Sequence, residues 1–217
     1  MDTAFISKLR PLLSAVAETM NLYVPRKVGE HLVCAPYDAN VDVEPELNDV
    51  RMCTPLKEFL LPLLERAAAM PEPARPMPVL PFAVFGLKAC DLRSAEILDR
   101  VFLEEGYEDP FYSARRENLF TITSDCSSLG ETCFCHLLGG KPYAEEGFDL
   151  NVSRLADGYV IQSGSARGRA FLFSHAELFG DVPDPLLNER AERREEALRR
   201  AARAHEAIPV EMPLKAV

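Results

Sequence analysis

The sequence predicts an α/β fold, in which a mixed sheet has flanking helices and cysteine-bearing loops at strand ends. Residues 82–86 and 119–123 are continuous apolar runs of the length expected for buried strands. Apolar residues at helical spacing lie between these runs, so the order is strand, helix, strand. Cys90 and Cys126 each follow one of the two strands, and open α/β sheets place their ligand sites beyond such carboxyl ends. We therefore expect these two cysteines to lie near each other.

The N-terminal segment predicts one helix followed by a pair of strands. Residues 3–20 place apolar side chains at a spacing near 3.6, which is typical of an amphipathic helix. Residues 21–24 and 31–35 are short apolar runs separated by a turn at residues 27–30, and each has the composition of a strand.

Two further helices are expected on either side of a proline-rich connector. The first covers residues 55–69, with Thr54 as its N-cap and Pro55 at its first position. Residues 70–81 cannot continue this helix because they are rich in proline, and they predict an extended connector. The second helix follows Asp91, its expected N-cap, and should turn inward the apolar residues Ala95, Ile97, Leu98, Val101 and Phe102.

The C-terminal part predicts a hairpin, an exposed helix and an arm. Residues 159–162 and 170–173 have the pattern of two strands joined by the glycine-bearing turn at residues 164–168. Residues 185–206 are rich in Arg, Glu and Ala, and they indicate an exposed helix with sparse apolar contacts at Leu186, Leu187, Ala191 and Leu198. We expect residues 208–217 to form an arm that docks on a neighbour.

Length and charge limit the organisation and the partners. The 217 residues suit one α/β domain over residues 1–180, followed by the helix and docking arm of residues 181–217. The net charge of −10 disfavours nucleic acid and anionic membrane surfaces, and it favours a basic partner subunit. No apolar run reaches the roughly 20 residues that span a bilayer, and the N-terminus does not have the pattern of a signal peptide, so we expect a cytoplasmic protein without membrane insertion.

Four of the six cysteines form a candidate metal-binding set. Cytoplasmic thiols stay reduced, so these cysteines indicate metal or redox chemistry before a disulfide framework. Cys126, Cys133 and Cys135 lie in one loop, and Cys90 lies 36 residues before Cys126. This spacing is neither the paired Cys-x2-Cys of a zinc ribbon nor the compact run of a ferredoxin. Three ligands from one loop and a fourth from a strand end favour a 4Fe-4S cluster over zinc, although structural zinc remains open.

Two other interpretations of the cysteines also remain open. Cys133 and Cys135 could exchange electrons as a dithiol and disulfide without any metal. Free cysteines are also common as small buried hydrophobic residues, and this account suits Cys34 and, less well, Cys53. It suits the other four poorly, because they lie among Asp, Ser, Thr and Gly in loops.

Other motifs in the sequence give weaker evidence about function. The chain has no Gly-x-Gly-x-x-Gly turn and no Walker loop, so it shows no nucleotide site of its own. Residues 164–168, with Arg167 and Arg169 nearby, could cradle a phosphate, but a hairpin turn is the simpler account. Lys88, Arg115 and Arg116 could offset the negative charge of a thiolate-bound cluster, or they could be ordinary surface charges.

Several segments resemble the beta subunit of cytoplasmic sulfhydrogenases and the related A subunit of anaerobic sulfite reductase. The resemblance covers about residues 50–175 and rests on Phe85-Gly86-Leu87-Lys88-Ala89-Cys90-Asp91-Leu92, Ile97-Leu98-Asp99-Arg100-Val101-Phe102, Asp109-Pro110-Phe111-Tyr112, Arg115-Arg116-Glu117-Asn118, Thr132-Cys133-Phe134-Cys135, Thr54-Pro55-Leu56-Lys57-Glu58-Phe59-Leu60 and Gly147-Phe148-Asp149-Leu150.

The resemblance implies an iron–sulfur electron-transfer subunit rather than a catalytic one. Cys90, Cys126, Cys133 and Cys135 match motif positions of the family, and they would bind one 4Fe-4S cluster. The implied partners are flavin-bearing and ferredoxin-type subunits and a catalytic subunit of an oxidoreductase complex. In the family a ferredoxin-like module follows this region. The sequence ends at Val217 without one, so we expect any additional clusters to lie on another subunit.

Overall fold

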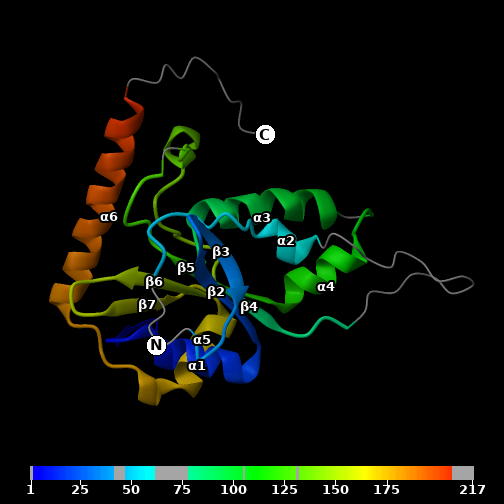
Figure 1. The fold of residues 1–217 in the computed structure, drawn as a ribbon, viewed down its shortest axis with the longest axis horizontal. Helices are drawn as coiled ribbons and strands as arrows, with labels where there is room; N and C mark the ends of the chain where they lie inside the picture. The colour runs from blue at the N-terminus through cyan, green and yellow to red at the C-terminus, as the bar shows by residue number, and fades with distance from the viewer. Residues whose placement is uncertain (1, 42–46, 62–77, 105, 131, 207–217) are drawn as a thin grey trace, which may run out of the picture.

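A seven-stranded mixed sheet organises the molecule and confirms the predicted α/β fold (Figure 1). The computed structural model describes residues 2–41, 47–61, 78–104, 106–130 and 132–206. The strand order is β1-β7-β6-β5-β4-β2-β3. The strands are β1 (Thr3–Ile6), β2 (Asn21–Val28), β3 (His31–Pro36), β4 (Phe82–Leu87), β5 (Leu119–Ser124), β6 (Leu150–Arg154) and β7 (Tyr159–Ser163).

Four parallel strands form the centre of this sheet. β4 pairs in parallel with β2 on one side and with β5 on the other, and β5 pairs in parallel with β6. The strands β1, β7 and β3 complete the sheet through antiparallel pairs. Because neighbouring parallel strands end at the same edge, the loops that follow β4 and β5 lie next to each other.

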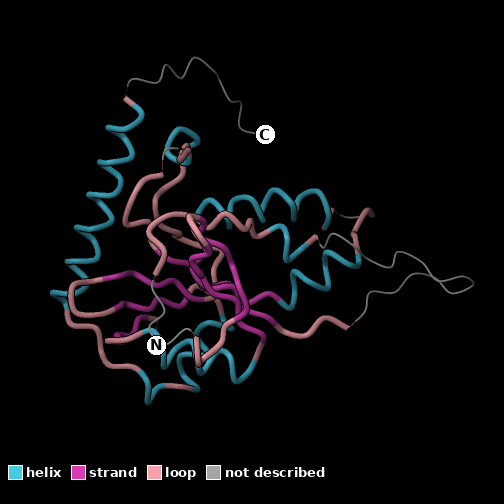
Figure 2. The backbone as a smooth tube through the Cα atoms, in the orientation of Figure 1, coloured by secondary structure: helices cyan, strands magenta, loops and turns pink. Residues whose placement is uncertain are grey.

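Helices cover both faces of the sheet (Figure 2). On one face, α1 (Leu9–Thr19) and α5 (Ala166–Ser174) pack Leu12, Val16 and Phe171 onto the apolar side chains of the strands. On the other face, α2 (Lys57–Leu60), α3 (Ala89–Phe102) and α4 (Pro110–Asn118) surround a second core that includes Leu60 and Tyr112. The long helix α6 (Asp184–His205) stands beside β6 and β7 (Figure 1). The result is a sheet between two helical layers.

The N-terminal helix predicted over residues 3–20 is only partly correct. Its first residues form β1, which pairs with β7, and the helix α1 begins at Leu9. Pairing with a strand more than 150 residues away overrides the local helical spacing, because β1 buries Ala4 and Ile6 in the sheet. The strands predicted over residues 21–24 and 31–35 are confirmed and form the hairpin β2–β3, which turns at Gly29 with a positive φ.

The hairpin expected over residues 159–173 also differs from the structure. Residues 170–173 belong to the helix α5, so the hairpin predicted with residues 159–162 is wrong, and β7 pairs instead with β6. Ser165 caps α5 by accepting the N–H of Gly168 at 3.0 Å. A side chain on Gly168 would overlap the backbone of Asp149, so glycine here permits close helix–strand packing rather than a turn.

The helix after β4 also differs in detail. α3 begins at Ala89, so Lys88 is its N-cap residue and Asp91 lies at its third position. Ala95 is buried as expected, but the side chains of Ile97 and Val101 are more than half exposed. The preceding helix predicted over residues 55–69 is described only to residue 61, where α2 occupies Lys57–Leu60. Residues 62–77, with most of the predicted connector, lie outside the described residues, as does the predicted arm at 208–217.

The exposed C-terminal helix is confirmed as α6, but its buried side differs from the expected one. Ala191 and Leu187 are exposed, whereas Arg190, Ala197 and Ala201 are buried. These three residues repeat at intervals of seven and four, which places them on one side of the helix. Within the part of the chain that the structure describes, no helix is both long and apolar enough to cross a membrane.

Candidate metal centre

Cys90 and Cys126 lie at the adjoining carboxyl ends of β4 and β5. Cys90 is the second residue of α3, and Cys126 follows β5 by two residues. The Asp91 carboxylate accepts the backbone N–H of Lys88 at 2.9 Å, which fixes the turn from β4 into α3. The backbone N–H of Cys126 donates to the carbonyl of Pro142 at 2.7 Å, which ties the start of the cysteine loop to its end. The expected proximity of the two strand ends follows from this topology.

Cys133 and Cys135 lie at the far end of the same loop. Cys135 begins a short 3-10 helix, η1 (Cys135–Leu138), which ends at Gly139 in the left-handed conformation. The backbone N–H of Gly130 donates to the sulfur of Cys133 at 3.3 Å. The backbone N–H of Gly140 donates to the carbonyl of Cys135 at 2.9 Å, so the loop folds back on itself. Hydrogen bonds from backbone amides to a sulfur stabilise a thiolate over a thiol.

The four sulfur atoms share one electrostatic environment. Burial raises the pKa of Cys90 to about 12; the charges of Asp91, Cys126 and Cys135 act in the same direction, and that of Arg51 opposes them. Burial raises the pKa of Cys126 to about 11, and the charges of Cys135 and Cys133 act in the same direction. Burial and the charge of Cys133 also raise the pKa of Cys135. Each of these thiols is therefore close enough to another for their charges to interact, and all four are half-buried.

The cysteines are not arranged as a closed chelate. Among the described residues, no group of three or more His, Cys, Asp or Glu side chains has the spacing needed to hold a metal ion. The donor chemistry nevertheless fits an iron–sulfur cluster, because the four residues are all thiols and the sulfur of Cys133 accepts a backbone hydrogen bond.

A buried lysine lies beneath the cysteine loops. Lys88 is fully buried, and its Nζ donates to the carbonyl of Asn48 at 2.6 Å, to the Ser124 hydroxyl at 2.8 Å and to the carbonyl of Asp125 at 3.1 Å. Burial lowers the pKa of Lys88, and the charge of Cys126 is the largest effect opposing it. Lys88 in turn lowers the pKa of Cys126 against the effect of burial. This ammonium group is therefore coupled to Cys126, while the charge of Arg51 acts on Cys90.

Arg115 and Arg116 lie at the other end of β5 from Lys88 and the cysteines. Both belong to α4, which leads into the amino end of β5, whereas the cysteines lie beyond its carboxyl end. The guanidinium of Arg116 pairs with Asp99 of α3 at 3.0 Å. This placement favours the alternative in which these two arginines are ordinary surface charges, and Lys88 alone of the three residues lies next to the cysteine loops.

Asp125 connects the cysteine loop to α6. Its carboxylate accepts two hydrogen bonds from the guanidinium of Arg194, at 2.8 and 3.0 Å. It also accepts the Ser153 hydroxyl at 2.7 Å and the side-chain amide of Asn151 at 3.1 Å. Arg190, one turn before Arg194, donates to the Ser153 hydroxyl at 2.8 Å and to Gln162. The residue directly before Cys126 is thus fixed by the sheet and the C-terminal helix together.

Sequence reasoning missed this connection, although a signal for it exists. Arg190, Arg194, Ala197 and Ala201 recur at intervals of four, three and four, which defines one side of a helix that combines arginine with alanine. Such a side suits packing on a polar partner, and the sheet beneath it presents Asn151 and other polar side chains.

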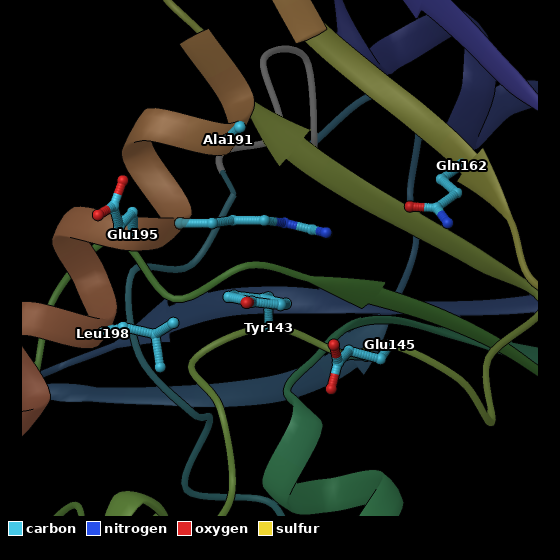
Figure 3. Close-up of a pocket in the computed structure, with 8 residues that line it drawn as sticks. Tyr143, Glu145, Gln162, Ala191, Glu195 and Leu198 are labelled. Carbon is cyan, nitrogen blue, oxygen red and sulfur yellow. The ribbon is translucent and has the colours of Figure 1, made fainter. Parts of the chain in front are cut away.

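A pocket lies between α6 and the end of the cysteine loop (Figure 3). Ala191, Glu195 and Leu198 of α6 face Tyr143 across a pocket of about 460 Å³. The guanidinium of Arg194 lies over the Tyr143 ring at 4.4 Å from its centroid. The pocket is open and bordered by the carboxylates of Glu145 and Glu195.

The structure also places three other residues considered from the sequence, Cys34, Cys53 and Arg167. Cys34 lies in β3, where burial raises its pKa to about 12, and Cys53 is exposed. Arg167 donates to the buried Asp149 carboxylate and to the carbonyl of Leu119, which leaves it no role in cradling a phosphate. The hairpin turn preferred for this segment is also incorrect, as the helix α5 occupies it.

Comparison with known proteins relates part of the chain to a hydrogenase subunit. No family model matches the sequence. The chain is 37% identical over 103 residues to the beta subunit of sulfhydrogenase 2 from Pyrococcus furiosus. These residues make up 48% of this chain and 30% of that protein, so the chain matches less than a third of the length of the relative.

Proposed function

This chain is related over about half of its length to the sulfhydrogenase beta subunits, and from this relationship we propose that it is an electron-transfer subunit of an oxidoreductase complex. In this proposal, Cys90, Cys126, Cys133 and Cys135 bind one 4Fe-4S cluster. Held by these residues, such a cluster would supply one-electron transfer, and the chain itself would perform no bond chemistry on a substrate.

The main support is the shared electrostatic environment of the four thiols. Cys90, Cys126, Cys133 and Cys135 come from two strand ends and one loop, and their charges act on one another above the buried ammonium of Lys88. Free thiols at Cys90, Cys126 and Cys135 are unfavourable to ionise, because burial raises the pKa of each. A bound metal supplies the positive charge that makes four neighbouring thiolates stable.

The surrounding residues would hold this site in place. Lys88 fixes the carbonyls of Asn48 and Asp125 and places one positive charge near the sulfur atoms. Asp125 anchors the start of the loop to α6 through Arg194. The backbone N–H of Gly130 donates to the sulfur of Cys133, an interaction that raises the potential of a thiolate-bound cluster.

The relative's name indicates how such a subunit is used. That protein is the beta subunit of a sulfhydrogenase, which implies an assembly of several subunits. We extend this to the present chain as a cytoplasmic protein with flavin-type, ferredoxin-type and catalytic partners. We also propose that residues 1–180 form the cluster domain and residues 181–217 a separate segment for docking.

Iron analysis of the anaerobically purified chain tests the proposal. We expect about four irons and four sulfides per chain, broad visible absorbance, and a paramagnetic signal after reduction. The variants Cys90→Ser, Cys126→Ser, Cys133→Ser and Cys135→Ser should each lose most of the iron, because each removes one ligand.

Cys34→Ser and Cys53→Ser are the matched controls, and both should retain full iron content. A colourless protein with stoichiometric zinc would instead establish a structural zinc scaffold. A metal-free protein that keeps redox activity as a Cys90→Ser variant would establish the dithiol mechanism of Cys133 and Cys135.

A further inference from the structure

Lys88 contacts both of the turns that carry candidate ligands at the ends of β4 and β5. Its backbone N–H donates to the Asp91 carboxylate at 2.9 Å, and its carbonyl accepts the backbone N–H of Asp91 at 2.9 Å. These bonds fix the turn that contains Cys90. Its side chain reaches the other turn, where Nζ donates to the carbonyl of Asp125 at 3.1 Å. One residue therefore joins the turn of Cys90 to the turn of Cys126.

The peptide group between Asp125 and Cys126 is held at both of its polar atoms. Its carbonyl accepts the hydrogen bond from Lys88, and its N–H donates to the carbonyl of Pro142 at 2.7 Å. Because a peptide group is planar and rigid, fixing both atoms also fixes the position of the Cys126 Cα atom. The placement of Cys126 relative to Cys90 thus depends on Lys88.

A bulge in β4 turns Lys88 toward this peptide group. The register of β4 against β5 shifts between Phe85 and Leu87. Residues two apart in a regular strand share a face, yet Phe85 belongs to the core under α1 and α5, and Leu87 to the core under α2, α3 and α4. The bulge therefore reverses the alternation of side chains, and Lys88 lies on the same side of the sheet as Ser124, to which it donates.

Gly86 and Asn48 maintain this bulge. Gly86 has a φ of +82°, and a side chain there would overlap Asn48 and Pro25, so the position requires glycine. The side-chain amide of Asn48 donates to the carbonyl of Gly86 at 2.8 Å, while the backbone carbonyl of Asn48 accepts Nζ of Lys88 at 2.6 Å. The segment before α2 is therefore part of the site, although the cysteine spacing gives no sign of it.

The surroundings of the Lys88 Nζ atom fit a charged ammonium group. Three acceptors surround Nζ, namely the carbonyls of Asn48 and Asp125 and the hydroxyl of Ser124. The Ser124 hydroxyl can itself donate to Oδ1 of Asn48 at 3.5 Å, which leaves it free to accept from the lysine. Three donated hydrogen bonds require the ammonium form, because a neutral amine has only two N–H groups. A permanent positive charge is thus buried between the two ligand-bearing turns.

We propose that Lys88 positions Cys90 and Cys126 relative to each other and sets the reduction potential of the cluster that they bind. The inference rests on the proposed function for the identity of the metal. One-electron reduction adds a negative charge to a cluster, and a fixed positive charge nearby stabilises the reduced form. A neutral residue at position 88 would therefore lower the potential, and it would also loosen the turn at Cys126.

Redox titration of the anaerobically purified chain, followed by electron paramagnetic resonance, tests the effect of the charge. Lys88→Met and Lys88→Gln both remove the charge. At a fixed solution potential, the reduced form should be at least about tenfold less populated, which corresponds to a midpoint lower by about 59 mV for one electron. The shift should be the same at about 20 mM and about 300 mM salt, because salt screens buried charges weakly. Lys88→Gln should keep more iron than Lys88→Met, because an amide can still donate hydrogen bonds.

Lys141→Met is the matched control. Lys141 lies beside Pro142 at the end of the cysteine loop, but its side chain is 40% exposed and pairs with Glu145. Removal of this screened charge should change neither the midpoint potential nor the iron content. Asn48→Asp is an independent variant that keeps Lys88 and places a carboxylate near its ammonium group. It should lower the potential in the same direction, and circular dichroism shows which variants are folded.

Binding of Co²⁺ to the metal-free chain tests the positioning role separately. Lys88→Met should weaken cobalt binding at least about tenfold, as loss of a residue that orients metal ligands commonly does. Lys141→Met should bind cobalt normally.

The outcomes separate this inference from the proposed function. Iron-loaded variants at Lys88 and Asn48 with the midpoint of the original chain, or an equal shift in Lys141→Met, would overturn the role of Lys88 and leave the proposed function intact. An original chain without iron, in which Lys88→Met still weakens cobalt binding, would disprove the proposed function and support the positioning role. Cobalt binding that does not depend on Lys88 would disprove that role.

Discussion

Single residues decide how closely the loops and helices approach the sheet. Lys88 is buried beneath the cysteine loops and makes three hydrogen bonds, which would be costly for a charged group without such partners. Gly168 acts through its lack of a side chain, which leaves space for the backbone of Asp149. In both cases the identity of the residue is set by a contact with a distant part of the chain.

Gly168→Ala should lower the free energy of unfolding by about 1–3 kcal/mol, as overpacking usually does. The new methyl group would meet the carbonyl of Asp149, and this cost should exceed the gain of about 1 kcal/mol in helix propensity. Denaturant titration followed by circular dichroism measures the change.

Gly180→Ala is the matched control. A methyl group at Gly180 would meet no atom within 4 Å, and the backbone φ there is not positive. We expect this variant to unfold at the same denaturant concentration as the original chain. Equal destabilisation by the two substitutions would show that the close approach at Gly168 does not matter.

At the scale of elements, α6 is attached to the sheet through polar contacts. Its buried positions are Arg190, Ala197 and Ala201, and Arg194 forms a half-buried ion pair with Asp125. The other ion pairs of the helix, such as Arg193 with Glu189, are more exposed and follow i,i+3 or i,i+4 spacing. The attachment of α6 beside Cys126 therefore depends mainly on the Asp125 network.

Arg194→Ala should destabilise the chain by about 1–3 kcal/mol, because it leaves the half-buried Asp125 carboxylate without its ionic partner. Arg193→Ala removes an exposed pair on the same helix and should cost at most about 0.5 kcal/mol. A double-mutant cycle with Asp125→Asn measures the coupling between Asp125 and Arg194. Coupling near zero would mean that α6 is attached by other contacts.

At the scale of the whole molecule, the site lies at an edge of an already complete fold. Two apolar cores lie on opposite faces of the sheet, and neither includes Cys126, Cys133 or Cys135. The described residues between 126 and 141 contribute η1 and no strand to this framework. We therefore expect the sheet to fold without a cofactor, and the cofactor to order mainly the cysteine loop.

Removal of the cofactor by a chelator under oxidising conditions should leave the far-ultraviolet circular dichroism spectrum nearly unchanged. Protease cleavage within residues 126–141 should increase several-fold, because the loop would lose its four-thiolate anchor. Limited proteolysis with mass spectrometry identifies the cleavage sites. Cooperative unfolding of the whole chain on metal removal would contradict this and favour a structural metal.

The sequence predicted the central elements well because their patterns are local. β4 and β5 are continuous apolar runs, and α6 shows a helical composition, so both kinds of element were located to within a few residues. β1 and α5 were assigned incorrectly, because the strand pairing of Thr3–Ile6 and the contact of Gly168 with Asp149 involve residues far apart in the chain. α4 was not predicted, although Asp109 and Pro110 form a standard helix start.

For the candidate site, the sequence by itself determined the donor chemistry: four cysteines in polar loops after apolar strands. Their placement at two strand ends was also predictable, because parallel strands deliver successive loops to one edge. Only the tertiary structure decided what surrounds them, namely the buried Lys88 and the Asp125–Arg194 pair. Composition reports a sum over all residues, whereas electrostatic interactions decay within about 10 Å, so only the fold shows which charges act on the sulfur atoms.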